Sequence, residues 1–383
     1  MKEIVKQMKN KTKIIIIFGT RPEAIKMLPV VLELRKHDCF DTKVIVTAQH
    51  REMLDQVMDL FGITADYDLN IMKKSQSLNY ITSEIINELK VIFDKEEPDM
   101  VLVHGDTTTT LASSMAAFYN NIPIGHVEAG LRTFDYQNPY PEEMNRVLTD
   151  KMASLLFAPT EQSYKNLIKD QLNEDNIIIT GNTVIDALYY TLPRAKEFKI
   201  NNEEILKIDT TKKMILVTAH RRENWGEPLK DICNALLEIS NSQDVEIIYP
   251  VHPNINVLPI VESMLGNKKN IHLIKPVDYI EMIKLMDMSY LILTDSGGLQ
   301  EEGPSLGKPV LVMRKTTERP EAVIAGTVKL VGTDTYTIVN SVINLLTSKE
   351  KYDIMAKATN PYGDGHASER IVSKIKEYFF INK

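Results

Sequence analysis

The segment 294–302, with the sequence TDSGGLQEE, follows an apolar run of strand length and begins a helix-like stretch. A strand, a Ser-Gly-Gly turn and a helix together suit an anion, because glycine lets the backbone approach a ligand and free N–H groups at a helix start face negative charge. Glu302, one helical turn further on, could accept hydrogen bonds from ribose hydroxyls. Ser296, Gly297, Gly298 and Glu302 therefore indicate a nucleotide diphosphate; the structural alternative is an Asp-Ser helix cap with a glycine turn.

Cationic side chains follow other predicted strands. Arg21 and Lys26 come after the first strand, at the start of a helix that Pro22 opens. An arginine in this place can bind phosphate through two hydrogen bonds. His220 stands beside two arginines after a strand of the second half, and Arg319 follows a later strand. Each could instead be a surface charge, but their shared position at strand ends favours an anion site.

Three carboxylates stand at strand ends or helix starts in the first half of the chain. Asp106 follows the third predicted strand, Glu128 follows the fourth, and Glu142 follows a Pro-Tyr-Pro sequence. The structural alternatives are a helix cap for Asp106, an ion pair with Arg132 for Glu128, and favourable placement at a helix start for Glu142. Together with cations that suit a diphosphate, the carboxylates indicate proton transfer next to a nucleotide leaving group.

The sequence has no cluster of metal ligands, no dinucleotide glycine fingerprint and no nucleophilic serine elbow. We therefore expect no metal and no other cofactor. The net charge of −7 argues against nucleic acid as a partner. The apolar run 14–18 is too short to span a membrane, and the first 13 residues resemble a basic extension rather than a signal peptide. Cys39 and Cys233 stand far apart and suit a reducing compartment, so we expect a cytoplasmic protein.

Apolar runs of strand length alternate with helical patterns along the whole chain of 383 residues. The runs are rich in Ile, Val and Leu without alternation, which is typical of parallel strands buried on both faces. Repeated β-α units predict an α/β fold of two doubly wound, Rossmann-like domains. The twelve predicted strands are 13–18, 42–47, 100–103, 124–127, 155–158, 177–180, 214–217, 246–249, 271–274, 290–293, 309–313 and 328–331.

A polar stretch over 196–213 separates six predicted strands from the other six. We expect an N-terminal domain over 1–190 that carries the carboxylates and a C-terminal domain over 191–366 that carries the Ser-Gly-Gly segment. A last amphipathic helix within 367–383 is expected to pack back on the first domain. Ligands of doubly wound sheets bind beyond the carboxyl ends of the strands, so we expect the two domains to face a cleft.

The order and spacing of these motifs, from residue 13 to residue 370, resemble the non-hydrolysing UDP-N-acetylglucosamine 2-epimerase family. The matching segments are GTRPEAIK (19–26), HGDTT (104–108), HVEAGLRT (126–133), PEE (141–143), HRREN (220–224) and SGGLQEE (296–302). The resemblance implies the B-type glycosyltransferase fold, a homodimer, and a UDP site mainly on the second domain. It also implies interconversion of UDP-N-acetylglucosamine and UDP-N-acetylmannosamine. In that reaction a base removes the sugar C2 proton while UDP leaves, and both then add back to 2-acetamidoglucal.

The resemblance also implies roles for single residues, although the sequence does not tell which carboxylate acts on which face of the sugar. The implied catalytic set is Asp106, Glu128, Glu142 and His220. The implied substrate-binding set is Arg21, Lys26, Arg146, His220, Ser296, Gly297, Gly298, Glu302 and Arg319.

Three alternatives stay open at this point. They are a hydrolysing 2-epimerase that releases UDP and free N-acetylmannosamine, a glycosyltransferase on the same fold, and a catalytically silent sugar-nucleotide sensor. The intact segment 21–26 favours the non-hydrolysing branch. Three carboxylates are more than a transferase or a sensor requires.

A second sugar-nucleotide site is also suggested by the resemblance. Bacterial relatives often bind UDP-N-acetylglucosamine as an activator, through a Gln-His-Arg-Gln-Met-like segment and an arginine further on. Here the segment contains Gln49, His50 and Glu52, and Ser75 stands where the arginine is expected. A carboxylate repels a diphosphate and a serine cannot clamp it, so we expect weak or absent activation by substrate.

Overall fold

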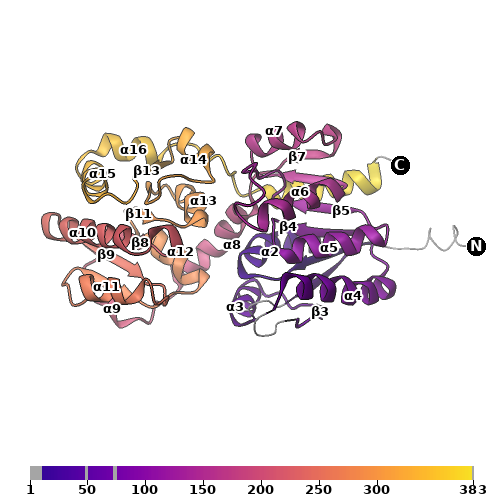
Figure 1. The fold of residues 1–383 in the computed structure, drawn as a ribbon, viewed down its shortest axis with the longest axis horizontal. Helices are drawn as coiled ribbons and strands as arrows, with labels where there is room; N and C mark the ends of the chain where they lie inside the picture. Colours follow the sequence, from indigo (N-terminus) through magenta and orange to yellow (C-terminus); the bar gives the residue numbers. More distant parts are fainter. Residues whose placement is uncertain (1–10, 48–50, 72–75, 382–383) are drawn as a thin grey trace, which may run out of the picture. The chain divides into compact units, whose positions relative to one another are not determined.

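The computed structural model describes residues 11–47, 51–71 and 76–381, without the side chains of residues 51, 52 and 381. The described part of the chain forms two compact units. The first contains the described residues up to Tyr190 together with those from Tyr362 onward, and the second contains Thr191–Pro361. Each unit is built on a parallel sheet with helices packed against it (Figure 1).

Seven parallel strands form the sheet of the first unit, in the order β3-β2-β1-β4-β5-β6-β7. Their common direction confirms the prediction from the unbroken apolar runs. The prediction of six strands is wrong, because β3 has only two residues and forms no apolar run of its own. The strands are β1 Thr12–Phe18, β2 Phe40–Val46, β3 Tyr67–Asp68, β4 Met100–His104, β5 Ile124–Val127, β6 Leu155–Ala158 and β7 Ile177–Ile179.

Helices cover both faces of this sheet (Figure 1). On one face α4 packs against α5 and α5 against α6, while α2 packs against α3 and α17. Ile15 and Ile17 of β1 share a buried apolar cluster with Ile85 and Leu89 of α4. The helices are α2 Arg21–Arg35, α3 Arg51–Phe61, α4 Leu78–Glu96, α5 Thr108–Tyr119, α6 Glu142–Met152, α7 Glu161–Lys169, α8 Thr183–Glu197, which begins in this unit, and α17 Ala367–Lys376, with a 3₁₀ turn at Glu174–Asn176 and a π-helical turn at Glu377–Ile381.

The second unit repeats this plan with six parallel strands in the order β10-β9-β8-β11-β12-β13. Its core joins strand residues such as Ile247 and Leu293 to Leu236 of α10. The strands are β8 Lys213–Thr218, β9 Val245–Pro250, β10 Ile271–Ile274, β11 Leu291–Thr294, β12 Val310–Val312 and β13 Val328–Leu330. The helices are α9 Glu203–Leu206, α10 Glu227–Ser242, α11 Leu258–Leu265, α12 Tyr279–Met288, α13 Gly297–Ser305, α14 Pro320–Ile324, α15 Thr335–Thr347 and α16 Lys349–Ala356, with a 3₁₀ turn at Arg222–Asn224.

The chain returns to the first unit through α17, drawn in yellow beside its strands in Figure 1. Asp186 of α8 is buried and accepts hydrogen bonds from the backbone N–H groups of Ala367 (3.2 Å) and Ser368 (2.7 Å). These donors belong to the first turn of α17, whose own N-cap residue makes no side-chain cap. At the other end of the helix, Lys376 Nζ lies 3.0 Å from His37 Nδ1. Asp186 therefore anchors the C-terminal helix.

We expect Asp186→Ala to lower the free energy of unfolding of the first unit, because two buried N–H groups lose their acceptor. A buried donor without a partner costs about 1–3 kcal/mol. Asp186→Asn is the matched control: the carboxylate accepts the two N–H groups on separate oxygens, and the single amide oxygen can still accept one of them, so the loss should be smaller. Urea unfolding followed by circular dichroism measures both. Equal stability of Asp186→Ala and the native chain would contradict the anchor.

Candidate active site

Both sheets reverse their strand order beside the first strand of the unit. The reversal lies between β1 and β4 in the first unit and between β8 and β11 in the second. The register places Ile16 opposite Leu102 and Thr218 opposite Thr294, so the strand ends are aligned. The loops after these strands therefore meet at a switch point, where ligands bind in open α/β sheets.

Glu23 ties together the two loops at the switch point of the first unit. Its buried carboxylate accepts the backbone N–H groups of Gly19 (3.1 Å) and Thr20 (2.8 Å) from the loop after β1. It also accepts the hydroxyls of Thr107 (2.7 Å) and Thr110 (3.2 Å) from the segment after β4. The sequence motif around Glu23 is therefore also a structural motif that holds the neighbouring loops in place.

Arg21 is the first residue of α2, with Pro22 beside it, as the sequence predicts. The loop that leads into this helix is tightly packed. A Cβ atom at Gly19 would lie only 2.2 Å from Thr47 Oγ1 and 2.6 Å from Thr109 Oγ1, so only glycine fits there. The close packing fixes the start of α2, and with it the place of Arg21.

Glu128 lies in a buried cluster of donors. Its Oε2 pairs with the Lys26 ammonium, lies 3.2 Å from His104 Nε2 and accepts Asn182 Nδ2 at 3.0 Å. Its φ of +65° belongs to the left-handed region, which few residues other than glycine adopt. Burial opposes ionisation, but Lys26 and His104 hold the pKa of Glu128 well below its usual range. Glu128 thus carries a lasting negative charge.

Asp106 has a different environment. Its Oδ2 accepts Arg146 Nη1 at 3.2 Å, and its backbone carbonyl accepts Asn145 Nδ2 at 2.9 Å. Arg146 is itself held by the buried Glu143, with Nε to Oε2 at 2.7 Å. Burial raises the pKa of Asp106 to about 6, against the opposing effect of Arg146, and two neighbouring carboxylates add to the increase. Asp106 can therefore exchange a proton near neutral pH.

Asp106 and Glu142 face the same hollow of about 430 Å³. Glu142 is the first residue of α6, as the sequence predicts, and Asp106 follows β4. Glu128 does not belong to the lining. The lining residues are Thr20, Gln76, Leu78, Ile81, Asp106, Thr107, Thr108, Pro141, Glu142 and Asn145.

The structural alternatives for two of the carboxylates are wrong. Thr107, and not Asp106, caps α5, because its side chain accepts the backbone N–H of Thr110 at 3.1 Å. Arg132 pairs with Asp150 (2.5 Å) and Asp170 (2.8 Å) instead of Glu128.

Asp295 organises the switch point of the second unit. This fully buried carboxylate accepts the backbone N–H groups of His220 and Arg221, both at 2.8 Å, and Asn224 Nδ2 at 3.1 Å. Burial opposes its ionisation, but His220 and the backbone donors hold the pKa of Asp295 below its usual range. The alternative interpretation of this segment as an Asp-Ser helix cap is wrong, because Ser296 occupies the N-cap position of α13 but its side chain makes no capping hydrogen bond.

A second hollow, of about 440 Å³, opens beside His220. The His220 ring stacks on His252, with ring centroids 5.7 Å apart and an interplanar angle of 13°. The Nε of Arg221 is buried and has no hydrogen-bond partner in the part of the chain that the structure describes. Because buried donors normally have partners, this N–H indicates an acceptor such as a bound anion. The lining residues are His220, Arg221, Arg222, Glu223, Trp225, His252 and Asn254.

The start of α13 lies against Arg319. A Cβ atom at Gly297 would stand 2.8 Å from the Arg319 guanidinium carbon, so glycine permits this close approach. Arg319 Nε donates to Glu301 Oε1 at 2.5 Å, which keeps the guanidinium beside the first turn. One residue later, the buried Glu302 accepts the Tyr279 hydroxyl at 2.8 Å. The Ser-Gly-Gly segment, Glu302 and Arg319 thus lie together, as the sequence predicts for an anion site.

Four functional side chains were not found by sequence reasoning: Glu23, His104, Asn182 and Asp295. Glu23, His104 and Asp295 lie within or beside the motifs described above. Their partners come from loops far away in the sequence, so only the sheet order reveals the contacts. Gln49, His50 and Ser75 lie outside the described residues, as does the side chain of Glu52. The expectation of weak or absent activation by substrate therefore stays a prediction.

Metal and membrane features were searched over residues 11–47, 51–71 and 76–381. No group of three or more His, Cys, Asp or Glu residues in these ranges is arranged to hold a metal ion. No helix in the same ranges combines the length and apolar character that a membrane crossing requires.

Comparison with known proteins identifies the family. The family model described as UDP-N-acetylglucosamine 2-epimerase matches residues 32–376. The UDP-N-acetylglucosamine 2-epimerase of Escherichia coli strain K12 is 55% identical over 369 residues, which cover 95% of this chain and 98% of the relative. The crystal structure of the Neisseria meningitidis UDP-GlcNAc 2-epimerase bound to UDP-GlcNAc is 52% identical, has a TM-score of 0.86, and covers 96% of this chain and 100% of that one.

The B-type glycosyltransferase fold is confirmed as well. A structure described as the glycotransferase of kitacinnamycin has a TM-score of 0.66 over 96% of this chain and 99% of its own, at 10% identity, which shows a common fold alone. The match of the family model and the two relatives of more than 50% identity confirm the resemblance found in the sequence motifs. The chain belongs to the UDP-N-acetylglucosamine 2-epimerase family.

Proposed function

We propose that this chain interconverts UDP-N-acetylglucosamine and UDP-N-acetylmannosamine without hydrolysis and without a metal or nicotinamide cofactor. The observation that carries the proposal is the pair of carboxyl groups, Asp106 and Glu142, on one hollow of the first unit. Family membership supplies the substrate class. The product provides N-acetylmannosamine units for surface polysaccharide.

Asp106 and Glu142 act as the proton carriers in this proposal. One carboxylate takes the C2 proton while the C2–H electrons form the C1–C2 double bond and the C1–O bond breaks, which gives 2-acetamidoglucal and UDP. UDP then attacks C1 again, and the other carboxyl group delivers a proton to the opposite face of C2. A raised pKa suits Asp106 to this exchange, whereas Glu128, which Lys26 and His104 hold ionised, keeps these two side chains in place.

The second unit holds UDP in this proposal. No adjacent carbonyl acidifies the C2 hydrogen, so the departure of the diphosphate must drive the step, and groups that stabilise its growing charge matter most. Arg221, His220 and the N-terminus of α13 suit the phosphates, and the Glu302 carboxylate suits the ribose hydroxyls. Arg21 and Lys26 retain their proposed part in substrate binding, while Arg146 is better explained as the partner of Asp106.

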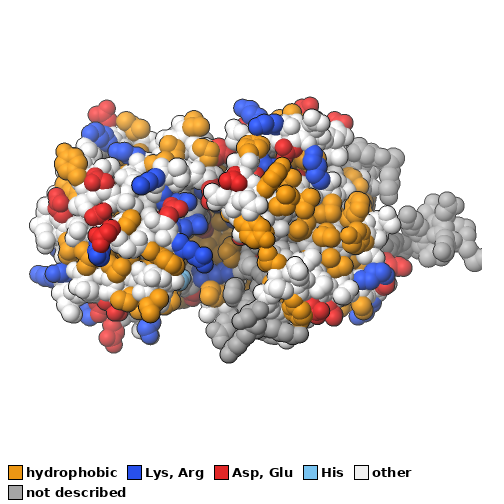
Figure 2. Space-filling view, in the orientation of Figure 1, with side chains coloured by type: hydrophobic (Ala, Val, Ile, Leu, Met, Phe, Trp, Pro, Cys, Tyr) orange, Lys and Arg blue, Asp and Glu red, His pale blue; other side chains and the backbone are white. Residues whose placement is uncertain are grey.

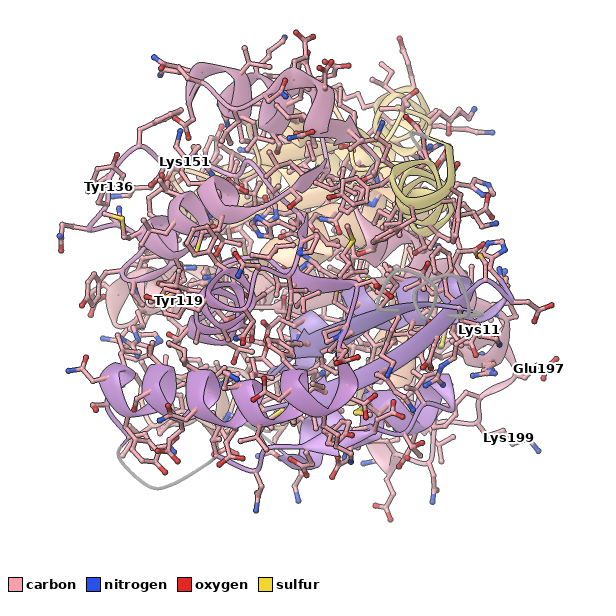
Figure 3. The ribbon with its side chains drawn as sticks, turned by 90° about the vertical axis from the view of Figure 1, so that its right-hand side faces the viewer. Lys11, Tyr119, Tyr136, Lys151, Glu197 and Lys199 are labelled. Atoms are coloured by element: carbon pink, nitrogen blue, oxygen red, sulfur yellow. The ribbon has the colours of Figure 1, made fainter. Side chains whose placement is uncertain are left out.

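A homodimer and a cytoplasmic location belong to the same proposal. Exposed apolar side chains gather over α5 and α6 in Figure 2, and they include Phe118, Tyr119, Met144 and Leu148. Tyr119 and Tyr136 are both labelled on the left of Figure 3, with Tyr136 nearer the edge. A contiguous apolar patch suits a subunit interface. The reducing cytoplasm suits the free thiols Cys39 and Cys233.

Incubation with UDP-N-acetylglucosamine in D₂O, followed by proton NMR, tests the reaction. We expect UDP-N-acetylmannosamine with deuterium at C2, and the same rate in the presence of a chelator. A hydrolysing enzyme would release free N-acetylmannosamine, a transferase would require an acceptor, and a sensor would leave the substrate unchanged. Loss of activity with chelator that only added metal restores would contradict the metal-free reaction.

We expect Asp106→Asn and Glu142→Gln each to lower kcat by about 10²–10⁴-fold, because a proton carrier is lost. Glu128→Gln should lower kcat as well, but its folded structure should also become less stable, since Lys26 and His104 lose their ionised partner. Single-turnover kinetics and urea unfolding of all three variants separate the two effects. Full activity in Asp106→Asn or Glu142→Gln would remove that residue from the proton-transfer pair.

The dimer is tested with Phe118→Glu combined with Leu148→Glu, which places two charges on the apolar patch. Sedimentation velocity should show a dimer for the native chain and a monomer for this variant, because desolvating unpaired charge at an interface is unfavourable. Ile354→Glu, at a more exposed apolar side chain of the second unit, is the control and should stay dimeric. A dimer that survives the double change would place the interface elsewhere.

A further inference from the structure

His126 of β5 is fully buried, and both of its ring nitrogens face hydrogen-bond acceptors. Nδ1 lies 2.6 Å from Asp150 Oδ1, and Nε2 lies 2.8 Å from the carbonyl oxygen of Gly105. A carbonyl oxygen can only accept, so Nε2 must carry a hydrogen. The charge of the ring then depends on the protonation state of Asp150.

Asp150 is an ionised acceptor. Its Oδ2 lies 2.5 Å from Arg132 Nη2 and accepts the backbone N–H of Gly130 at 3.3 Å. Burial opposes its ionisation, but the charges of His126 and Arg132 hold the pKa of Asp150 below its usual range. An ionised carboxylate has no hydrogen to donate, so His126 Nδ1 must be the donor. With hydrogen on both nitrogens, the ring is an imidazolium.

The surrounding charges balance this buried cation. Asp150 comes from α6, Arg132 from the loop after β5, and Asp170, which accepts Arg132 Nε at 2.8 Å, from the end of α7. On the neighbouring strand β4, Val103 lies opposite His126, and the adjacent His104 contacts Glu128 instead. Two cations, His126 and Arg132, are thus paired with two carboxylates, Asp150 and Asp170, and buried charges require such pairing.

The imidazolium holds the backbone that carries Asp106. Gly105 is fixed at both polar groups, because its N–H donates to the Val127 carbonyl at 3.0 Å and its own carbonyl accepts from His126. The next carbonyl, of Asp106, accepts Asn145 Nδ2. The peptide that presents the Asp106 carboxyl to the hollow is therefore held on three sides.

We propose that His126 is a positioning residue, which holds the Gly105–Asp106 peptide so that the Asp106 carboxyl keeps its place beside the reacting sugar. The inference rests on the proposed function for the role of Asp106. His126 is not among the residues that line either hollow, and its contact with the segment that carries Asp106 is the one to the Gly105 carbonyl.

Two amide variants separate the two contacts. In His126→Asn the amide nitrogen takes the place of Nδ1 and keeps the hydrogen bond to Asp150, while the contact to Gly105 is lost. In His126→Gln the amide nitrogen takes the place of Nε2 and keeps the contact to Gly105. We expect His126→Asn to lower kcat by about 10–100-fold with little change in KM, and His126→Gln to lower kcat by less than about fivefold, since small misplacements of a catalytic group cost rate rather than binding.

Rates are expressed per folded molecule, from unfolding curves of each variant. Equal losses of kcat in the two variants, or losses that follow the folded fraction alone, would overturn the positioning role. A native chain that does not epimerise would overturn the proposed function instead, and the charge of His126 is therefore measured independently. Nitrogen-15 NMR of the native chain, assigned with the His126→Gln spectrum, should show a hydrogen on both ring nitrogens, because both face hydrogen-bond acceptors. A ring nitrogen without hydrogen would overturn this hydrogen-bond pattern.

Discussion

A buried carboxylate that accepts backbone N–H groups organises the switch point of each sheet. Glu23 does so in the first unit, where it joins the loop after β1 to the segment after β4. Asp295 does so in the second unit, where it holds the loop after β8 from its own place after β11. In both units the groups proposed to contact the ligand depend on this interaction. Arg21, Asp106, His220 and the start of α13 all lie in or beside the loops that the two carboxylates hold.

The carboxylates of the first unit differ through their neighbours rather than through their chemistry. Glu128 has an ammonium, an imidazole and an amide on one oxygen and stays ionised. Asp106 has one shared guanidinium and carries a raised pKa. Environments that push the pKa values of neighbouring acids apart are typical of sites that move protons, because one group must hold charge while another exchanges a proton. The division of roles therefore follows from how completely each charge is compensated.

The helix α6 concentrates much of this control in one rigid element. It supplies Glu142 to the hollow, Asn145 and Arg146 to Asp106, and Asp150 to His126. Residues three and four positions apart lie on one face of a helix. Positions 142, 145, 146 and 150 therefore share the face of α6 that is turned to the carboxyl ends of the strands, where Asp106 lies. Movement of this helix would displace Glu142, one of the two proposed proton carriers, together with the side chains that support Asp106, the other.

The sequence by itself determined the class of fold, the family and the motif segments from which the candidate site is built. Unbroken Ile, Val and Leu runs identify parallel strands because both faces of such strands are buried, and the glycine, proline and acidic motifs are local, so they can be read without contacts. The short strand β3 was missed, because two residues form a strand only through their pairing with β2.

The tertiary structure alone decided the charge states and the supports of the site. Glu128 meets Lys26 across 102 positions of the chain and Asn182 across 54, and Asp295 meets the His220 backbone across 75. The tertiary structure also pairs Arg132 with Asp150 and Asp170 and places Thr107 at the N-cap of α5. These contacts exclude the Glu128–Arg132 ion pair and the Asp106 cap that the sequence allowed. The physical reason is that propensity and burial pattern act along the chain, whereas electrostatic interactions depend on distances through space that only the sheet order sets.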